Sequence, residues 1–236
     1  MSNEVGDWVK QLSTEAKEQF ERYYSRLVSE NERMNLTGIV DRDEVFLKHF
    51  WDSVQVSRIS AFRELPKDAS CVDVGTGAGF PGLPLAISYP TMTFTLVDSL
   101  QKRLRFLDAV VSEIHLENVS LVHGRAEDLG RVPDFRNRFD VALSRAVARL
   151  NVLMEVSLPF VRVGGYFFAY KGPGLKDELN EGKRVAKRLG AEVVGVESFS
   201  LPDGQGERNI VIVRQRMATP SSYPRKAGTP QRKPLG

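Results

Sequence analysis

The stretch that decides the fold lies at residues 71–82 of this chain of 236 residues and reads CVDVGTGAGFPG. A short apolar run that carries one acid, Asp73, leads directly into four glycines, after which a helix is expected. Glycine permits positive φ and close approach of a ligand to the backbone, and the N–H groups that open the next helix face that ligand. The stretch therefore predicts a strand, a turn and a helix that together bind an adenine-nucleoside cofactor.

The spacing of three of the glycines is compatible with a dinucleotide cofactor. The spacing Gly77-x-Gly79-x-x-Gly82 satisfies the dinucleotide fingerprint, and Asp98 lies near the distance at which that fingerprint places a ribose-binding acid. The fingerprint, however, puts its first glycine directly after the strand and another glycine five positions later. Here that later position holds Phe80. The dinucleotide interpretation is therefore the weaker one.

Counted from the strand, the same turn gives a different pattern. The spacing Asp73-x-Gly75-x-Gly77-x-Gly79 resembles the first motif of S-adenosylmethionine-dependent methyltransferases. This register needs no glycine at position 80, so it accommodates the whole turn. It favours S-adenosylmethionine as the cofactor and methyl transfer as the reaction.

From residue 70 onward, predicted strands and helices alternate. Seven strands are expected, at 70–74, 93–98, 119–123, 139–143, 165–171, 192–199 and 209–214. Helices are expected near 81–89, 101–115, 148–160 and 175–189. Residues 201–206 are too few for a crossover helix, so the last two strands should pair antiparallel. The predicted fold class is α/β and Rossmann-like, with a seven-stranded, mostly parallel sheet that ends in an antiparallel hairpin, whereas a dehydrogenase would need a second βαβαβ half.

The first 64 residues have the apolar spacing of helices. Ser13 can cap one helix, and another is expected from Asp41 or Asp43 to about Ile59. These helices should form a cap packed beside the sheet. The expected organisation is an N-terminal helical extension over 1–64, a methyltransferase domain over 65–216 and a basic flexible tail over 217–236.

Positive charge gathers toward the C-terminal end. The net charge is +3, but no acid occurs from Asn209 onward, and six cations there contribute +6 and leave −3 for the remainder: Arg214, Arg216, Arg225, Lys226, Arg232 and Lys233. The Pro, Gly, Ser and Thr content of the tail argues against a packed helix and favours a flexible arm that follows a phosphate backbone. A solubilising terminus without a partner is an equally weighted alternative.

The remaining composition excludes several classes of site. The single cysteine, Cys71, falls in a predicted strand and is expected to be a small buried side chain, so no disulfide or cysteine-rich metal site is possible. The histidines lack metal-ligand spacing, and no metal is expected. His49 falls between Phe46 and Phe50, which favours a core histidine, with a contact at the mouth of the active site as the alternative. No signal segment or membrane span is apparent, so a soluble, cytoplasmic protein is expected.

In an open parallel sheet, ligands collect beyond the carboxyl ends of the strands. After the first strand come Gly75, Gly77 and Phe80. Asp98 ends the second strand and could accept hydrogen bonds from both ribose hydroxyls. Its alternative role is to cap the helix expected near Gln101.

The later strands end in further candidates. Ala126 and Glu127 follow the third strand and either lie against adenine or form an acidic helix start. Arg145 follows the fourth strand, where it could bind phosphate, bind a guanine edge, reach toward the cofactor, or pair with an acid at the surface. Lys171 ends the fifth strand and offers a charge for phosphate, although a surface lysine would give the same sequence.

An ordered set of short motifs resembles the bacterial small-subunit ribosomal RNA guanine-N7 methyltransferases, also called the glucose-inhibited division protein B (RsmG/GidB) family. The resemblance covers about residues 12–236, and each motif is specific only in combination with the others. The matching stretches are 35–37, 48–53, 73–82, 96–103, 124–128, 144–146, 170–172, 206–208 and 223–230.

The resemblance implies S-adenosylmethionine as the methyl donor and N7 of one guanine in 16S rRNA as the acceptor, with the small ribosomal subunit as partner. It implies that the cofactor is contacted by Gly75, Phe80, Ala126, Glu127 and Arg145. Gly77 and Asp98 are added because they lie at the carboxyl ends of predicted strands. Candidates for the RNA side are His49, Arg145, Lys171, Arg225 and Lys226. Direct SN2 transfer to an unprotonated N7 needs no covalent intermediate, and no catalytic residue is assigned. A monomer is expected.

Three alternatives remain at this point. The chain could methylate another nucleic acid or a small molecule, or it could be a nicotinamide-dependent reductase. It could also be a ribosome-assembly factor that binds RNA and has kept the cofactor turn without turnover.

Overall fold

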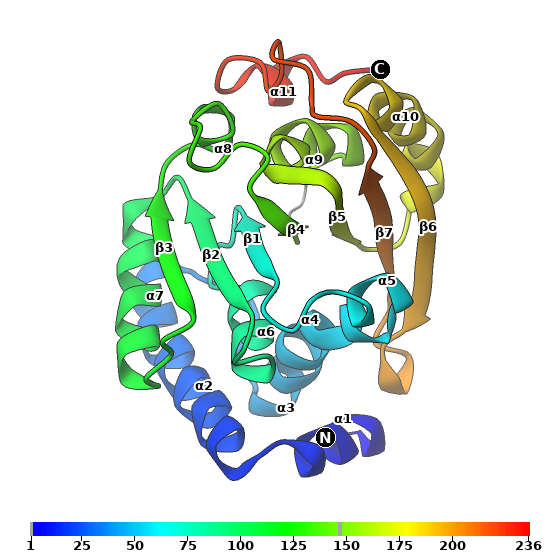
Figure 1. Cartoon of the computed structure of the whole chain (residues 1–236). Helices are drawn as coiled ribbons and strands as arrows, with labels where there is room; N and C mark the ends of the chain where they lie inside the picture. Colours follow the sequence, from blue (N-terminus) through cyan, green and yellow to red (C-terminus); the bar gives the residue numbers. More distant parts are fainter. Residues whose placement is uncertain (1, 146–147) are drawn as a thin grey trace.

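The computed structural model describes residues 2–145 and 148–236, which form one twisted sheet of seven strands with helices on both faces (Figure 1). Ala146, part of one motif of the resemblance, lies outside the described residues. The strands lie in the order β3-β2-β1-β4-β5-β7-β6; β1 to β5 run parallel, and β7 runs antiparallel to β5 and β6. Their bounds are β1 (Ser70–Val74), β2 (Thr93–Asp98), β3 (Val119–His123), β4 (Phe139–Ser144), β5 (Val161–Lys171), β6 (Ala191–Ser200) and β7 (Glu207–Gln215). The predicted fold class is confirmed.

β5 departs most from its predicted bounds. It begins at Val161 rather than at residue 165. Within the added residues Gly164 takes a φ of +87°, and the pairing of β5 with β4 shifts register at this point. An irregularity of this kind lets a strand continue through residues that leave the regular ladder.

Helices cover both faces of the sheet, so the central strands are apolar on both sides. Successive residues of β1 face opposite layers: Cys71 packs in the apolar cluster that includes α6 and α7, and Val72 packs in the cluster that includes α9 and α10. This alternation is the period of two that a strand imposes. The helices of this part are α6 (Gly82–Ser88), α7 (Gln101–Glu113), α8 (Ala126–Leu129), α9 (Leu150–Ser157) and α10 (Leu175–Arg188).

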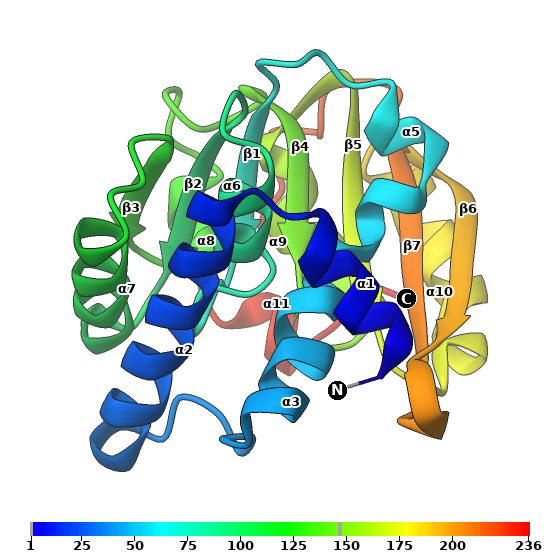
Figure 2. The ribbon, with the colours of Figure 1, turned by 90° about the horizontal axis from the view of Figure 1, so that it is seen from below.

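The N-terminal residues are helical and pack on the α6 and α7 side of the sheet. Ser13 caps α2 as expected, because its Oγ accepts a hydrogen bond from the N–H of Ala16 at 3.1 Å. α2 then packs against α6 and α7 (Figure 2). The helices here are α1 (Asn3–Gln11), α2 (Thr14–Met34), α3 (Arg42–Val45), α4 (Asp52–Val54) and α5 (Ser60–Arg63).

The segment predicted as a single third helix changes pitch along its length. Asp41 caps its start by accepting from the N–H of Glu44 at 3.0 Å. α3 then passes into a π-helix at Phe46–Trp51, and α4 passes into a 3₁₀ turn at Gln55–Arg58. π turns inside helices are frequent at functional sites, and His49 lies within this one.

The C-terminal segment, residues 217–236, is packed against the domain, in contrast to the flexible arm that its composition predicted. Arg225 donates to both carboxylate oxygens of Glu155 on α9, at 2.8 and 2.6 Å, and Glu155 is fully buried. Leu235 is buried, and its carbonyl accepts a hydrogen bond from the side chain of Asn151. A short helix, α11 (Thr229–Arg232), lies beside α9 (Figure 1).

Side chains of the domain satisfy the backbone of this segment. Arg136 donates to the carbonyls of Thr219 at 2.7 Å and Tyr223 at 2.9 Å. Arg131 donates to the carbonyls of Ser222 and Pro224. Because these arginines supply the partners that a helix or strand would supply, residues 219–224 pack without regular structure. Glu155 and Arg136 lie 70 or more residues away from the positions that they contact, which is why composition alone did not reveal these contacts.

Within residues 2–145 and 148–236, no helix combines the length and apolarity that crossing a membrane requires. The division into an extension over 1–64, a domain over 65–216 and a tail over 217–236 stays a prediction.

Arg225→Ala should lower the free energy of unfolding by about 3 kcal/mol, because it leaves the buried carboxylate of Glu155 with only the backbone N–H of residue 225 as a hydrogen-bond donor. Lys226→Ala, at an exposed neighbouring position, should change it by less than about 0.5 kcal/mol. Urea unfolding followed by tryptophan fluorescence measures both variants. Equal small effects would show that the C-terminal segment does not contribute to the folded state.

Candidate active site

A buried acid holds the turn that leaves β1. Asp73 is fully buried, and its Oδ2 accepts hydrogen bonds from the hydroxyl of Thr76 at 2.7 Å and from the N–H of Gly82 at 2.9 Å. Burial raises the pKa of Asp73 to about 6, although both hydrogen bonds act in the opposite direction. The N–H groups of Gly75 and Thr76 both donate to the carbonyl of Val97 on β2. The two ends of the turn are therefore fixed to the sheet.

The glycines of this turn divide into two pairs. Gly75 and Gly77 have φ of +74° and +62°; a Cβ on Gly75 would meet nothing within 4 Å, and one on Gly77 would meet only a backbone oxygen at 4.0 Å. A Cβ on Gly79 would lie 2.7 Å from the hydroxyl of Tyr23, and one on Gly82 would lie 2.3 Å from Leu96. The second pair is required for packing, whereas the first pair borders open space. A ligand can therefore approach the backbone at Gly75 and Gly77.

Asp98 lies beside this open part of the turn. Its side chain is 3% exposed, and its Oδ2 accepts from the N–H of Gly77 at 3.0 Å. Its Oδ1 accepts from the N–H of Leu100 at 2.8 Å, directly before α7, and Arg103 contacts the carboxylate at 3.2 Å. Asp98 therefore supports the start of α7 and also contacts the glycine turn; its role as an acceptor for ribose stays a prediction.

Ala126 and Glu127 occupy the first turn of α8, beyond the end of β3. The N–H of Gly124 donates to the carbonyl of Asp98 at 3.1 Å, which links the ends of β3 and β2. Glu127 accepts a hydrogen bond from the N–H of Gly228 at 2.8 Å. The C-terminal segment therefore contacts one of the residues predicted to bind the cofactor, a contact that the sequence did not indicate.

Arg145 and His49 both pack on Phe80. The guanidinium carbon of Arg145 lies 4.8 Å from the centroid of the Phe80 ring, and the His49 ring stacks on the same ring at 4.6 Å. The structure therefore brings together a residue of the turn, the residue after β4 and the histidine of the π-helix. His49 is next to the predicted cofactor site, as its less favoured interpretation required.

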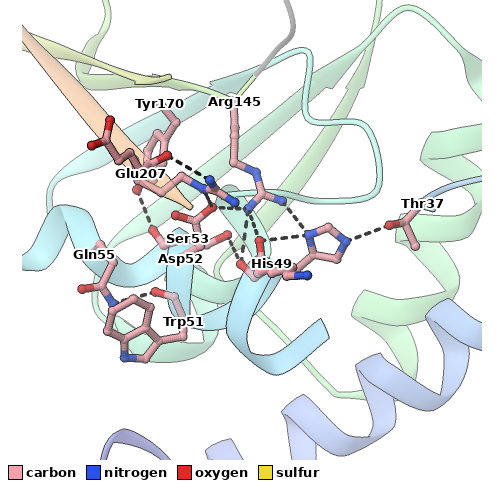
Figure 3. A network of polar contacts seen from close by, with 11 residues as sticks. Thr37, His49, Trp51, Asp52, Ser53, Gln55, Arg145, Tyr170 and Glu207 are labelled. Atoms are coloured by element: carbon pink, nitrogen blue, oxygen red, sulfur yellow. Dashed lines mark hydrogen bonds and ion pairs between the residues drawn. The ribbon is translucent and has the colours of Figure 1, made fainter. Parts of the chain in front are cut away.

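A carboxylate that sequence reasoning left without a role lies under these residues (Figure 3). Oδ2 of Asp52 accepts from Arg145 at 3.3 Å and from Arg208 at 3.4 Å, and Asp52 is 3% exposed. Burial raises the pKa of Asp52, while the two guanidinium groups lower it. Because His49 and Asp52 are three residues apart in helical structure, the sequence could have placed them on one face. The contact with Arg208 spans 156 residues and had no local signal.

His49 is held uncharged by its surroundings. Its Nε2 lies 2.7 Å from the hydroxyl of Thr37, and its Nδ1 lies 3.4 Å from Arg145. Burial, followed by the positive charge of Arg145, lowers the pKa of His49 to about 3. At neutral pH this side chain therefore acts as a neutral polar ring.

Of the remaining residues predicted to contact RNA, Lys171 lies at the same cavity as His49 and Arg145, whereas Arg225 and Lys226 do not. Nζ of Lys171 donates to the carbonyl of Ala148 at 2.8 Å and pairs with Glu178 at 3.0 Å, so it is a fixed residue rather than a mobile surface lysine. Lys171 lines a cavity together with His49 and Arg145. Arg225 is occupied by Glu155, and neither Arg225 nor Lys226 lines that cavity.

Residues 16–211 match the family described as rRNA small subunit methyltransferase G, or GidB. The chain belongs to this family. Ribosomal RNA small subunit methyltransferase G of Brevibacillus brevis is 50% identical over 224 residues, which covers 95% of this chain and 93% of that protein. The protein of the same name from Lactobacillus johnsonii is 46% identical over 235 residues, with 99% and 98% covered. The family resemblance found in the sequence is confirmed.

Solved structures share the fold of this rRNA small subunit methyltransferase G family member. The M. jannaschii TYW2 protein in complex with AdoMet superposes with a TM-score of 0.54 at 15% identity and covers 70% of this chain and 77% of its own. The YcgJ protein of Bacillus subtilis gives a TM-score of 0.52 at 14% identity, with 69% and 98% covered. At these identities the likeness concerns the fold alone. The Rossmann-like methyltransferase architecture is confirmed.

We expect the His49 ring to stay uncharged from pH 8 down to pH 5, because burial and Arg145 disfavour its protonated form. NMR titration of the ring resonances measures this, with His49→Gln identifying the signal by its loss. A folded-state pKa below the usual 6.5 means that His49 contributes stability above pH 6.5, which is lost as the pH falls toward 3. A titration midpoint near pH 6.5 would contradict the burial seen here.

Proposed function

We propose that this protein transfers a methyl group from S-adenosylmethionine to N7 of a specific guanine in 16S rRNA, by direct displacement and without a covalent intermediate. Membership of the rRNA small subunit methyltransferase G family supports a ribosomal RNA substrate. The structural observation that carries the proposal is the turn after β1. Its open glycines, Gly75 and Gly77, lie beside Asp98, and the following Phe80 carries the stacked Arg145.

The residues around the turn fit the donor. A backbone that leaves space where side chains would stand accepts a nucleoside at close range, and Gly75 and Gly77 provide this. Asp98 supplies a carboxylate at the end of β2, where nucleoside-binding sheets place an acid. Phe80, Ala126, Glu127 and Arg145 complete the set that we expect to hold S-adenosylmethionine. When bound, the donor supplies an electrophilic methyl group.

The chain's own residues act by positioning. Guanine N7 presents an unprotonated lone pair, so no residue has to remove a proton. A neutral His49 and a carboxylate held between two arginines are consistent with a site that orients its ligands rather than one that transfers protons. Holding two reactants in the correct geometry accounts for large rate accelerations without a nucleophile.

The accessibility of N7 limits the form of the RNA. In paired RNA this edge lies in a deep, narrow groove that side chains cannot enter, so we expect a loop or an extruded nucleotide as the substrate. His49, Arg145 and Lys171 line one cavity and are the expected RNA contacts of the site. We also propose that the protein acts as a monomer, in the cytoplasm and without a metal.

Incubation of the full chain with methyl-labelled S-adenosylmethionine and purified small ribosomal subunits, or their bare RNA, should label one guanine of the RNA. Mapping of the modified base identifies the position. Label in protein or in small molecules alone would reject the proposal. Binding of RNA and donor without any transfer would favour a non-catalytic assembly factor.

Gly75→Trp should abolish binding of S-adenosylmethionine, because the indole would fill the space beside the turn. Gly75→Ala is the matched control, since it imposes the same unfavourable φ of +74° while its Cβ meets no atom within 4 Å. Isothermal titration calorimetry should show measurable donor binding for Gly75→Ala and none for Gly75→Trp. Wild-type affinity in Gly75→Trp would place the donor elsewhere, and binding of NAD in its stead would reject the cofactor.

A further inference from the structure

A cavity of about 320 Å³ opens beside the proposed donor site, at the same edge of the sheet. This volume lies at the lower end of the range of about 300–1,000 Å³ that small-molecule sites occupy. The cavity shares Arg145 with the proposed donor site, and His49, which also lines the cavity, packs with Arg145 on Phe80. The residues that line it and matter here are Lys48, Asp52, Arg145, Lys171, Phe199 and Arg208.

The cavity wall carries an uncompensated positive charge. The two lysines are neutralised from outside, Lys48 by Glu44 at 2.6 Å and Lys171 by Glu178 at 3.0 Å. The two arginines share the single carboxylate of Asp52, at 3.3 and 3.4 Å. Two guanidinium groups facing one carboxylate leave one positive charge in excess. A ligand with one negative charge would balance it, as a phosphodiester does.

Of the two arginines, Arg208 is the one that has a side-chain N–H group available for a ligand. It opens β7 at the carboxyl-end edge of the sheet, and 26% of its side chain is exposed. Its Nε contacts Asp52 and its Nη1 donates to the carbonyl of Glu207 at 3.0 Å, whereas its Nη2 has no acceptor among the described residues. Arg145, by contrast, uses both Nη atoms on Lys48, His49 and Asp52. A guanidinium with a free N–H at the cavity mouth is suited to an anionic oxygen.

An aromatic side chain forms part of the same wall. Phe199 lies near the end of β6, across the hairpin from Arg208, and the two residues pair in register. Its ring packs edge-on to Trp51 at 6.3 Å, which fixes its orientation. A base in single-stranded RNA stacks on such a ring. The β6–β7 hairpin therefore offers a cation for phosphate and an aromatic surface for a base within one cavity.

We propose that this cavity holds the target nucleotide of the RNA, with Arg208 binding a backbone phosphate and Phe199 contacting the extruded base. The assignment rests on the proposed function, since it places the acceptor beside the donor. Arg145 then lies between the two ligands and contacts both. Asp52 is a positioning residue that holds the two arginines at their spacing.

The test compares Arg208→Ala with Arg216→Ala. Arg216 follows the other end of the same strand and pairs with exposed Glu192 at 2.7 Å, so it matches Arg208 in charge but not in place. Binding of bare 16S rRNA is measured by filter retention over a range of salt concentrations. Arg208→Ala should bind roughly 10- to 100-fold more weakly at low salt, because a charge-assisted contact is lost. Its plot of log affinity against log salt should be shallower by about 0.7, the value for one phosphate of a single strand.

Three controls separate RNA binding from a structural role. Arg208→Lys keeps a point charge and should retain most of the salt slope. Affinity for S-adenosylmethionine should be unchanged in Arg208→Ala, because Asp52 keeps its ion pair with Arg145, and binding is measured well below the unfolding midpoint of the variant. Arg216→Ala should match the wild type within about twofold in RNA affinity.

Two results would overturn the assignment. A wild-type salt slope in Arg208→Ala would show that Arg208 contacts no phosphate, and a matching loss of donor affinity would show that it acts only through Asp52 and Arg145. Failure of the proposed function is a separate outcome, because it is seen as absence of methyl transfer by the wild type. The salt slope of RNA binding decides the role of Arg208 without requiring turnover.

Discussion

The structure depends on the carboxylate of Asp73. By accepting from both Thr76 and Gly82, it ties the end of β1 to the start of α6 across the glycine turn. Gly82 can sit there only because it lacks a Cβ, which would stand 2.3 Å from Leu96. With both ends fixed, the middle of the turn is held away from other side chains, and the open backbone at Gly75 and Gly77 results. The cost is a carboxylate with no access to water, which its raised pKa reflects.

A second buried acid organises the opposite wall of the site. Asp52 lies on α4, in the N-terminal part of the chain, and holds Arg145, which follows β4, and Arg208 of β7. Tyr170 of β5 donates to the carbonyl of Ser53 at 2.5 Å, next to this carboxylate (Figure 3). Four segments, at α4, after β4, in β5 and in β7, are thereby joined at one place. The two arginines create a positive field, and the neutral state of His49 is one of its effects.

Local patterns in the sequence predicted most of the fold. Alternation of apolar strands and helices located the seven strands, and the short link at 201–206 predicted the antiparallel hairpin. Ser13 and Asp41 marked helix starts through their own side chains. The glycine turn located the proposed donor site, because the signal lies within a dozen residues.

The sequence could not show contacts between residues that are far apart along the chain. These are the contacts of Asp52 with Arg208, Glu155 with Arg225, and Glu127 with Gly228. Composition described the C-terminal segment as polar and charged, but its order comes from Glu155, Arg131 and Arg136, which lie elsewhere in the chain.

The contact between Glu127 and Gly228 affects the order in which parts of the protein can pack while the chain is being synthesised. These residues are 101 positions apart, so α8 leaves the ribosome long before the segment that supports it. The nascent chain can form its sheet while this helix still lacks its last partner. The C-terminal segment therefore packs against α8 and α9 only late in biosynthesis.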